Sequence, residues 1–185
     1  ALFQYTGGTT GIPKAAMLSH RNLVSNVLQC SHWLTDLEPG REVVMGAIPF
    51  FHVFGMTVCM ALSVSMGGKL IVVPNPRPID NVMNQIQREK ASIFPGVPAM
   101  YIGIVNHPEV AKYDLKSVKA CISGAAPLPM DVQEQFGAIT GGRLVEGYGL
   151  TEAAPVTHCN PVYGLRKCGS IGVPLPDVEA RLVSL

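Results

Sequence analysis

A run of glycines and threonines near the start of the chain, "YTGGTTGIPK", has the composition of an anion-binding loop. Glycines let successive backbone N–H groups point into one concavity, which suits phosphate oxygens, while the threonine hydroxyls and Lys14 add donors and a positive charge. It is not a Walker A sequence, because Ile12 and Pro13 separate Gly11 from Lys14. An ordinary glycine-rich turn is the alternative, but three hydroxyls and a lysine favour phosphate binding. The candidate residues are Thr6, Gly7, Gly8, Thr9, Thr10, Gly11 and Lys14.

Two further segments offer the residue types of a nucleotide site. In "VEGYGLTE", Tyr148 could stack on a planar base, and Glu152 could bind Mg²⁺ with nucleotide phosphates, since hard cations take oxygen ligands. The alternative is a core tyrosine and a solvated glutamate. In "SGAAPL", which begins at Ser123, small residues follow a predicted strand, so a flat ring could lie against the backbone. A plain strand-to-helix turn explains that segment equally well.

The segment "PFFHVFG" places His52 among aromatic residues. A lone histidine in apolar sequence is usually a hydrogen-bonded core residue. The neighbouring Phe50, Phe51, Phe54 and Met56 could equally form the wall of a pocket for an apolar substrate. Both interpretations stand on the residues alone.

Composition narrows the class of protein. The chain has 185 residues, 48% hydrophobic and 15% charged, which is enough for one domain with a sizeable core and excludes a disordered protein. Its formal charge of +1 gives no electrostatic reason to expect a nucleic-acid partner. The five cysteines show no ligand-like spacing, so they indicate reduced, mostly buried thiols in a cytosolic protein rather than a disulfide framework.

The stretch from Val43 to Gly68 contains no Asp, Glu, Lys or Arg and is long enough to suggest a membrane span. Gly46, Pro49 and Gly55 interrupt it, however. A strand at Val43–Ile48, a loop and a buried helix fit the segment better.

The elements that must position these residues alternate between strands and helices. Helical spacing of Leu23, Val27, Cys30 and Leu34 after Ser19 predicts a capped helix. Further helices are predicted over 81–90, with Asp80 as cap, and from 131 to the glycines at 141–142. The alternation predicts an α/β fold with a mainly parallel sheet flanked by helices, whose ligands gather at the carboxyl ends of strands, as at the loop 6–14. The predicted strands are Leu2–Tyr5, Val43–Ile48, Lys69–Val73, Ser92–Phe94, Val118–Ile122 and Leu144–Glu146.

These segments, in this order, resemble the adenylate-forming family of acyl-CoA synthetases, luciferases and peptide-synthetase adenylation domains. The resemblance runs from Gln4 to Val183 and adds "GSIGVPLPDVEARLV" to the segments above. Gly7 stands where the family loop usually has serine, and Ala15 where glycine is usual. The loop variant and "GYGLTEAAPVTHCNP" look most like bacterial long-chain fatty-acid–CoA ligases. The resemblance covers the central part of the large N-terminal domain, so residues 1–185 are expected to be a partial AMP-binding domain without the preceding part or the small C-terminal domain.

The resemblance also implies roles for individual residues. The loop from Thr6 to Lys14 would hold the β and γ phosphates of ATP, Thr151 would contact the α phosphate, and Glu152, with Thr6, would bind Mg²⁺. Lys14, Thr151 and Glu152 are thereby the candidate catalytic residues. His52 and Met56 would lie at the acyl entrance, with Gly96 near the acyl tunnel. The residues expected to line the adenine are Gly124, Ala125, Ala126, Glu146, Gly147, Tyr148 and Gly149.

The implied reaction is ATP-dependent activation of a long-chain fatty acid to acyl-AMP and then, with CoA, to acyl-CoA. A ligase for another carboxylic acid, aryl or medium-chain, is the alternative within the family, and a nucleotide-binding module without turnover is the alternative outside it. The family takes its adenylation lysine from the C-terminal domain, so these 185 residues alone are expected to be inactive. The expected location is cytoplasmic, with peripheral contact at the inner face of the membrane, and a homodimer is compatible with the family.

Overall fold

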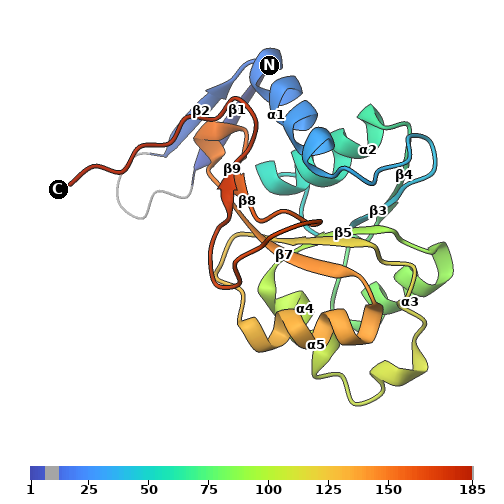
Figure 1. Ribbon diagram of the computed structural model, residues 1–185. Helices are drawn as coiled ribbons and strands as arrows, with labels where there is room; N and C mark the ends of the chain where they lie inside the picture. The colour runs from blue at the N-terminus through green and yellow to red at the C-terminus, as the bar shows by residue number, and fades with distance from the viewer. Residues whose placement is uncertain (7–12, 185) are drawn as a thin grey trace.

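The computed structural model describes residues 1–6 and 13–184, and its helices and strands form three layers (Figure 1). Helix α1 (His20–Trp33), the π-helix η1 (Gly55–Ala61) and α2 (Leu62–Ser65) cover one face of a central sheet. Helices α3 (Asp80–Glu89), α4 (Pro98–Val105) and α5 (Met130–Thr140) cover the other. The α/β fold with a mainly parallel sheet is confirmed.

The central sheet has the strand order β4-β3-β5-β6-β7-β8-β9 within the described residues. The strands from β4 to β7 pair in parallel, whereas β7–β8 and β8–β9 are antiparallel. Parallel neighbours require crossover connections, and the helices between successive strands supply them. The strands are β3 (Val43–Gly46), β4 (Lys69–Val72), β5 (Ile93–Gly96), β6 (Ala120–Ser123), β7 (Arg143–Gly149), β8 (Val156–Cys159) and β9 (Val173–Pro174).

Two hydrophobic clusters fill the space between the layers. One packs Val27, Val58 and Leu62 against the sheet, and the other packs Ile86, Tyr101 and other side chains against its opposite face. Since the parallel strands are covered on both faces, they can be almost entirely apolar, as β5 and β6 are. Four of the five cysteines are buried and all five are free, as the sequence predicted.

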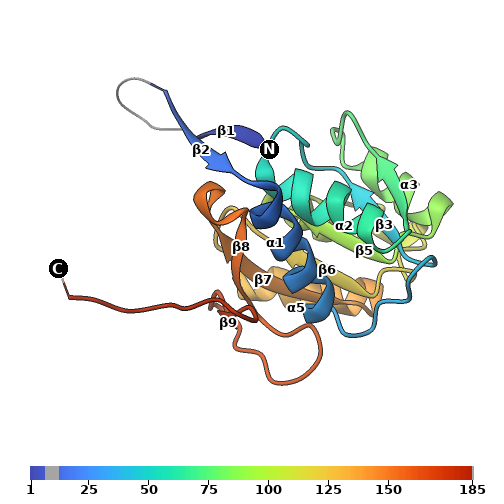
Figure 2. The same cartoon turned by 90° about the horizontal axis from the view of Figure 1, so that it is seen from above.

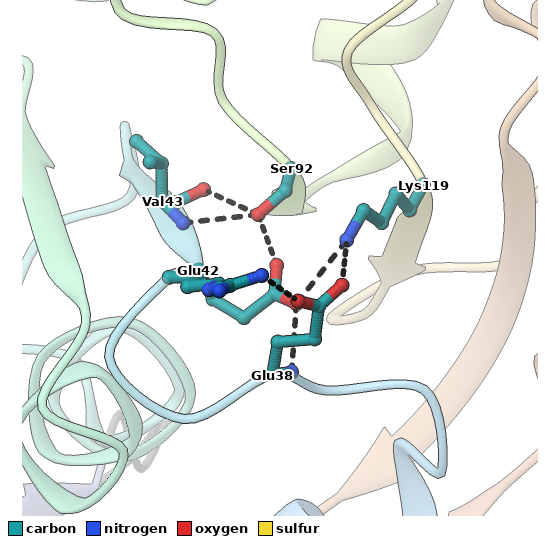
Figure 3. Close-up of polar contacts among 6 residues, drawn as sticks. Glu38, Glu42, Val43, Ser92 and Lys119 are labelled. Carbon is teal, nitrogen blue, oxygen red and sulfur yellow. Dashed lines mark hydrogen bonds and ion pairs between the residues drawn. The ribbon is translucent and has the colours of Figure 1, made fainter.

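The N-terminal ends of three strands meet at a buried carboxylate, that of Glu42 (Figure 3). Glu42 is 1% exposed, immediately before β3. It accepts hydrogen bonds from the Ser92 hydroxyl and from the Glu38 backbone N–H at 2.9 Å, and its Oε1 lies 3.4 Å from Lys119 Nζ. Ser92 precedes β5 and Lys119 precedes β6. The charge is therefore partnered, as burial of a carboxylate requires.

The glycine-threonine loop connects the strands of a hairpin outside the parallel sheet, contrary to the prediction from the strand pattern. Strand β1 (Leu2–Thr6) pairs antiparallel with β2 (Lys14–Leu18), and Thr6 is the register partner of Lys14. The hairpin projects from the body of the molecule (Figure 2). The sequence "KAAML" was not predicted as a strand, because alanine, methionine and leucine favour helices and only pairing with β1 makes the segment extended.

Other local predictions are confirmed or corrected by hydrogen bonding. Ser19 caps α1 through a reciprocal pair with Asn22, as expected, and Gly141 ends α5 in a left-handed conformation. Asp80 is not a cap: α3 begins with it, and its carboxylate instead accepts from the hydroxyl of Tyr113 at 2.8 Å. The charge-free stretch forms β3, a loop and the η1–α2 helix. In the described part of the chain, no helix combines the length and apolarity needed to cross a membrane.

Candidate functional site

A cavity of about 260 Å³ lies at the carboxyl ends of β6 and β7. It brings together three segments that are far apart in the sequence: the histidine loop before η1, the "SGAAPL" segment and the "GYGLTE" segment. Six of the expected nucleotide-site residues and His52 are in its wall. The lining residues are His52, Val53, Phe54, Ile122, Gly124, Ala125, Gly147, Tyr148, Gly149, Leu150, Thr151, Pro155 and Val156.

The cavity forms where β7 changes partners. From Arg143 to Glu146 the strand pairs in parallel with β6, and from Gly147 onward it pairs antiparallel with β8. The sequence had placed Gly147–Gly149 in a loop, but they continue the strand. A crevice between neighbouring strands that diverge at their carboxyl ends is the usual ligand position in such sheets.

Glycines bring the cavity walls close to one another. A Cβ on Gly149 would lie 2.3 Å from the carbonyl oxygen of Pro155, so only glycine allows this approach of β7 to the following segment. A Cβ on Gly124 would lie 3.2 Å from the Phe54 ring, and one on Gly147 would lie 3.2 Å from Ile122 Cγ2. The small residues therefore leave bare backbone at the cavity, as the sequence motifs predicted.

Tyr148 is the aromatic side chain of the "GYGLTE" segment at this cavity, and it is 43% exposed. Its ring lies edge-on to that of His158 on β8, with 6.3 Å between ring centroids and 66° between ring planes. The exposed face of such a ring is suited to stacking against a planar ligand. The alternative interpretation of Tyr148 as a core residue is wrong.

The hairpin of β1 and β2 packs beside this cavity. Leu18 of β2 is buried with Val53 and Ala154, and β2 contacts the 3₁₀ turn η3 (Thr151–Ala153). The Gln4 side chain donates to the carbonyl of Phe51 at 2.9 Å, which joins β1 to the histidine loop. Thr6 and Lys14, the ends of the predicted loop, are therefore carried on a hairpin fixed at its base near the cavity rim. The other residues predicted for the loop, Gly7, Gly8, Thr9, Thr10 and Gly11, lie outside the described residues.

The acidic residue proposed for Mg²⁺, Glu152, lies on η3 and is exposed, immediately after the cavity residue Thr151. Its carboxylate and the hydroxyls of Thr151 and Thr6 are oxygen donors of the kind that Mg²⁺ prefers. Among residues 1–6 and 13–184, no three His, Cys, Asp or Glu side chains gather as a metal site. A single carboxylate fits an ion that takes most of its ligands from substrate phosphates and water.

His52 is held at the cavity by its own loop. Its Nδ1 accepts a hydrogen bond from the backbone N–H of Phe54 at 3.1 Å, so the neutral ring carries its proton on Nε2. His52 is exposed and in the cavity wall, which rules out the core-histidine interpretation. Met56 instead packs beneath the hairpin, against the cluster of Leu18, Val53 and Ala154.

A larger, mostly apolar cavity of about 540 Å³ lies at the carboxyl ends of β3, β4 and β5. Sequence reasoning had suggested a pocket beside Phe50 and Phe51, and both line this cavity. The remaining wall residues were not predicted. The prolines that follow the apolar strands could have indicated them, because they mark the loops that form this wall. The lining residues are Gly46, Ala47, Ile48, Pro49, Phe50, Phe51, Val72, Val73, Pro74, Pro76, Arg77, Ile79, Val97, Ala99 and Met100.

Like Thr6, Lys14, Met56 and Glu152, three further predicted site residues line neither cavity. Ala126 is exposed just beyond the smaller one, and Gly96 is buried against Tyr101, whose hydroxyl would be 2.9 Å from an added Cβ. Glu146 is the register partner of Ser123 and is half-buried. Burial raises the pKa of the Glu146 carboxyl, and a hydrogen bond from the Leu128 backbone partly opposes the shift.

Comparison with known proteins assigns the family. The family model described as AMP-binding enzyme matches residues 1–184. The chain belongs to the AMP-binding enzyme family. It is 48% identical to a long-chain-fatty-acid–CoA ligase of Bacillus subtilis, over all of this chain and 33% of that protein. The chain thus spans about a third of the length of this AMP-binding relative.

Two solved structures of AMP-binding enzymes share the fold. A long-chain-fatty-acid–CoA ligase from Archaeoglobus fulgidus superposes with a TM-score of 0.85 at 31% identity, covering 98% of this chain and 37% of that one. An anthranilate CoA ligase in complex with anthranoyl-AMP superposes with a TM-score of 0.88 at 25% identity, covering 98% and 35%. The AMP-binding enzyme fold is therefore the fold of this chain.

Proposed function

We propose that this chain is the central part of the large N-terminal domain of an ATP-dependent long-chain fatty-acid–CoA ligase, called here the longer enzyme. The observation that carries the proposal is the 260 Å³ cavity, where bare backbone, Tyr148 and Thr151 lie beside the hairpin of Lys14. The similarity to the Bacillus subtilis ligase supports the fatty-acid substrate.

In the proposed first step, a carboxylate oxygen of the fatty acid attacks the α phosphorus of ATP. The bond from that phosphorus to the bridging oxygen breaks, so acyl-AMP forms and pyrophosphate leaves. In the second step the CoA thiol attacks the acyl carbonyl carbon, loses its proton, and displaces AMP. Both steps depend mainly on positioning and on neutralising phosphate charge.

Each site residue has a proposed part in these steps. Lys14 and the loop before it would bind the leaving phosphates, and Thr151 would donate to the α phosphate. Tyr148 would stack on the adenine over the backbone of Gly124 and Gly147. The Nε2 proton of His52 would point to the acyl carboxylate from the opposite wall. These roles would explain why a hairpin with a lysine lies beside a cavity that has small residues in its wall.

Mg²⁺ would be held by Glu152, with Thr6 as a second oxygen donor, and would neutralise charge on the polyphosphate. Glu152→Gln keeps the size of the side chain but removes its charge, so the longer enzyme should need more Mg²⁺ for half-maximal adenylation. The matched control is Glu134→Gln, at an exposed position of α5. An unchanged Mg²⁺ dependence in Glu152→Gln would contradict the metal role.

The larger cavity is suited to an apolar part of a substrate, either the acyl chain or the arm that carries the CoA thiol. Its position beside Phe50 and Phe51, next to the cavity of His52, supports a passage toward the reacting carboxylate. Ala99→Trp would fill it from the exposed wall. A shift of selectivity toward shorter acids would indicate the acyl chain, whereas a raised KM for CoA alone would indicate the thiol arm.

The decisive experiment is ATP–pyrophosphate exchange by the longer enzyme across a series of acids. We expect exchange to rise with chain length toward the long-chain fatty acids. A preference for aryl acids would favour the alternative raised by the similarity to the anthranilate ligase. ATP binding without any exchange would indicate a nucleotide-binding module.

The 185 residues alone should bind ATP weakly and form no acyl-CoA. The resemblance implies that the adenylation lysine comes from another domain, and Lys14 is already assigned to the leaving phosphates. Calorimetry for ATP and mass spectrometry for the thioester, on one purified sample, test both halves. Sustained palmitoyl-CoA formation would show that the reaction does not need a lysine from another domain.

A further inference from the structure

Tyr148 has a cross-strand partner, His158, that does not line the ligand cavity. Tyr148 and His158 are register partners in the antiparallel pairing of β7 with β8, so their side chains leave the same face of the sheet. Tyr148 lines the cavity and His158 does not. The two rings meet edge-on, 6.3 Å apart between centroids. His158 thus contacts the ring of Tyr148 from outside the cavity lining.

Hydrogen bonds join the same two residues through Thr157. The Thr157 hydroxyl donates to the Tyr148 carbonyl at 3.3 Å, and it lies 3.0 Å from His158 Nδ1. Since the hydroxyl has one proton, Nδ1–H of the neutral imidazole must donate to the threonine oxygen. This contact holds the orientation of the His158 ring.

The strand that carries this pair is itself anchored to the protein interior. Val156, at the start of β8, exchanges two hydrogen bonds with the buried side chain of Asn26 on α1, at 2.7 and 3.0 Å. Val156 and Cys159 are both buried in the core cluster on this face. Thr157 and His158 therefore project from a fixed backbone, which allows them to restrain a neighbour.

Tyr148 needs such a restraint because its own strand is irregular there. The pairing of β7 with β8 shifts register between Tyr148 and Gly149, and Gly147 and Gly149 on either side have no side chains to pack against the ring. A 43% exposed tyrosine between two glycines would otherwise move among its rotamers.

We infer that His158, acting with Thr157, is a positioning residue that holds the Tyr148 ring in the orientation that stacks on the nucleotide base. The inference rests on the proposed function, because it assigns the base to Tyr148. It predicts that β8 sets affinity for the base and discrimination among bases. Binding of the fatty acid and of CoA should be independent of His158.

The test compares His158→Ala with His158→Phe in the longer enzyme, using KM values and ATP-over-CTP discrimination in pyrophosphate exchange. Edge-on aromatic pairs contribute enough that His158→Ala should raise the KM for ATP by roughly two- to tenfold. Discrimination should fall, while KM values for fatty acid and CoA stay the same. His158→Phe keeps a ring and should restore most of the affinity. His32→Ala, at an exposed position of α1, is the matched control.

Two further variants separate the possible failures. Thr157→Val removes only the hydroxyl and should also raise the KM for ATP, by a smaller factor. It replaces His158→Ala as the test if that variant does not fold. A lowered melting temperature in His158→Ala with unchanged ATP affinity and discrimination would overturn the inference. If Tyr148→Ala also leaves the KM for ATP unchanged, the proposed base site is wrong as well. If only Tyr148→Ala raises it, the site stands and the positioning role fails.

Discussion

The two ends of the parallel sheet differ in whether their buried polar groups have hydrogen-bond partners. At the N-terminal end, Glu42 is buried with donors from Ser92, Glu38 and Lys119 (Figure 3). At the carboxyl end, the hydroxyl of Ser123 is buried without a hydrogen-bond partner among the described residues. The first end is an internally satisfied network, and the second combines small residues, cavities and exposed polar side chains.

The difference separates stability from binding within one sheet. A buried carboxylate with good partners joins the strands that begin around it, because losing any partner leaves a polar group unsatisfied. At the carboxyl end, glycines leave room for a ligand, and the exposed side chains of His52 and Tyr148 lie in the cavity wall. Packing and hydrogen bonding are therefore incomplete at the end of the sheet where a bound ligand can supply the missing contacts.

The largest expected effect is on stability and comes from the N-terminal end of the sheet. Glu42→Ala should lower the free energy of unfolding by roughly 3 kcal/mol, because the Ser92 hydroxyl and the Glu38 N–H would lose their acceptor. Denaturant unfolding of the chain measures it. Glu42→Gln keeps an acceptor oxygen and should lose about half as much. Equal losses in the two variants would contradict this explanation, because they would mean that the carboxylate charge, which both variants remove, holds this end together.

At the open end, Lys14→Ala in the longer enzyme should slow adenylation on the order of a hundredfold, the scale for losing one preorganised donor to developing charge. Transfer from preformed acyl-AMP to CoA should change much less, since pyrophosphate has already left. Lys112→Ala, a 70% exposed lysine elsewhere, is the control. Rapid-quench measurements of both half-reactions decide, and equal slowing of the two would remove Lys14 from the phosphate site.

A methyl group added in the cavity wall should weaken nucleotide binding. Gly147→Ala would place its Cβ 3.2 Å from Ile122 Cγ2 and 3.5 Å from the His158 carbonyl oxygen, within the cavity wall. We expect ATP affinity to fall about tenfold, which is about 1.4 kcal/mol. Gly137→Ala on α5 meets only the Gly142 carbonyl at 3.5 Å and should not change affinity. Calorimetric titration with ATP would show whether the cavity holds the nucleotide.

The smallest effect compares two buried serines. Ser92→Ala removes a donor to Glu42 and an acceptor for the Val43 N–H at 2.9 Å, and should cost about 1.5 kcal/mol of stability. Ser123→Ala removes a hydroxyl without a described partner and should stay within about 0.5 kcal/mol of the wild type. Parallel unfolding curves measure both. If Ser123→Ala costs as much as Ser92→Ala, the two ends of the sheet do not differ as described.

The sequence predicts those helices and strands whose residues have a local conformational preference that matches the observed structure. Runs such as "VVMGAI" have the β-branched and apolar content of buried strands, and the Ser19 cap precedes a clear helical stripe. It failed at "KAAML" and at Asp80, where partners distant in sequence decide the conformation. Strand β8 was missed for the same reason, because "VTHC" is short and has little pattern of its own.

By itself the sequence determined which residue types can bind a nucleotide: the glycine-threonine run, the tyrosine between glycines, and the small residues after a strand. Their order and spacing also determined the family resemblance. Only the tertiary structure decided which of them meet. The change of partner by β7 opens the cavity at Gly147, and the packing of Leu18 on Val53 and Ala154 fixes the base of the hairpin that carries Lys14. Pairing and packing between distant segments are long-range interactions, so local sequence patterns do not specify them.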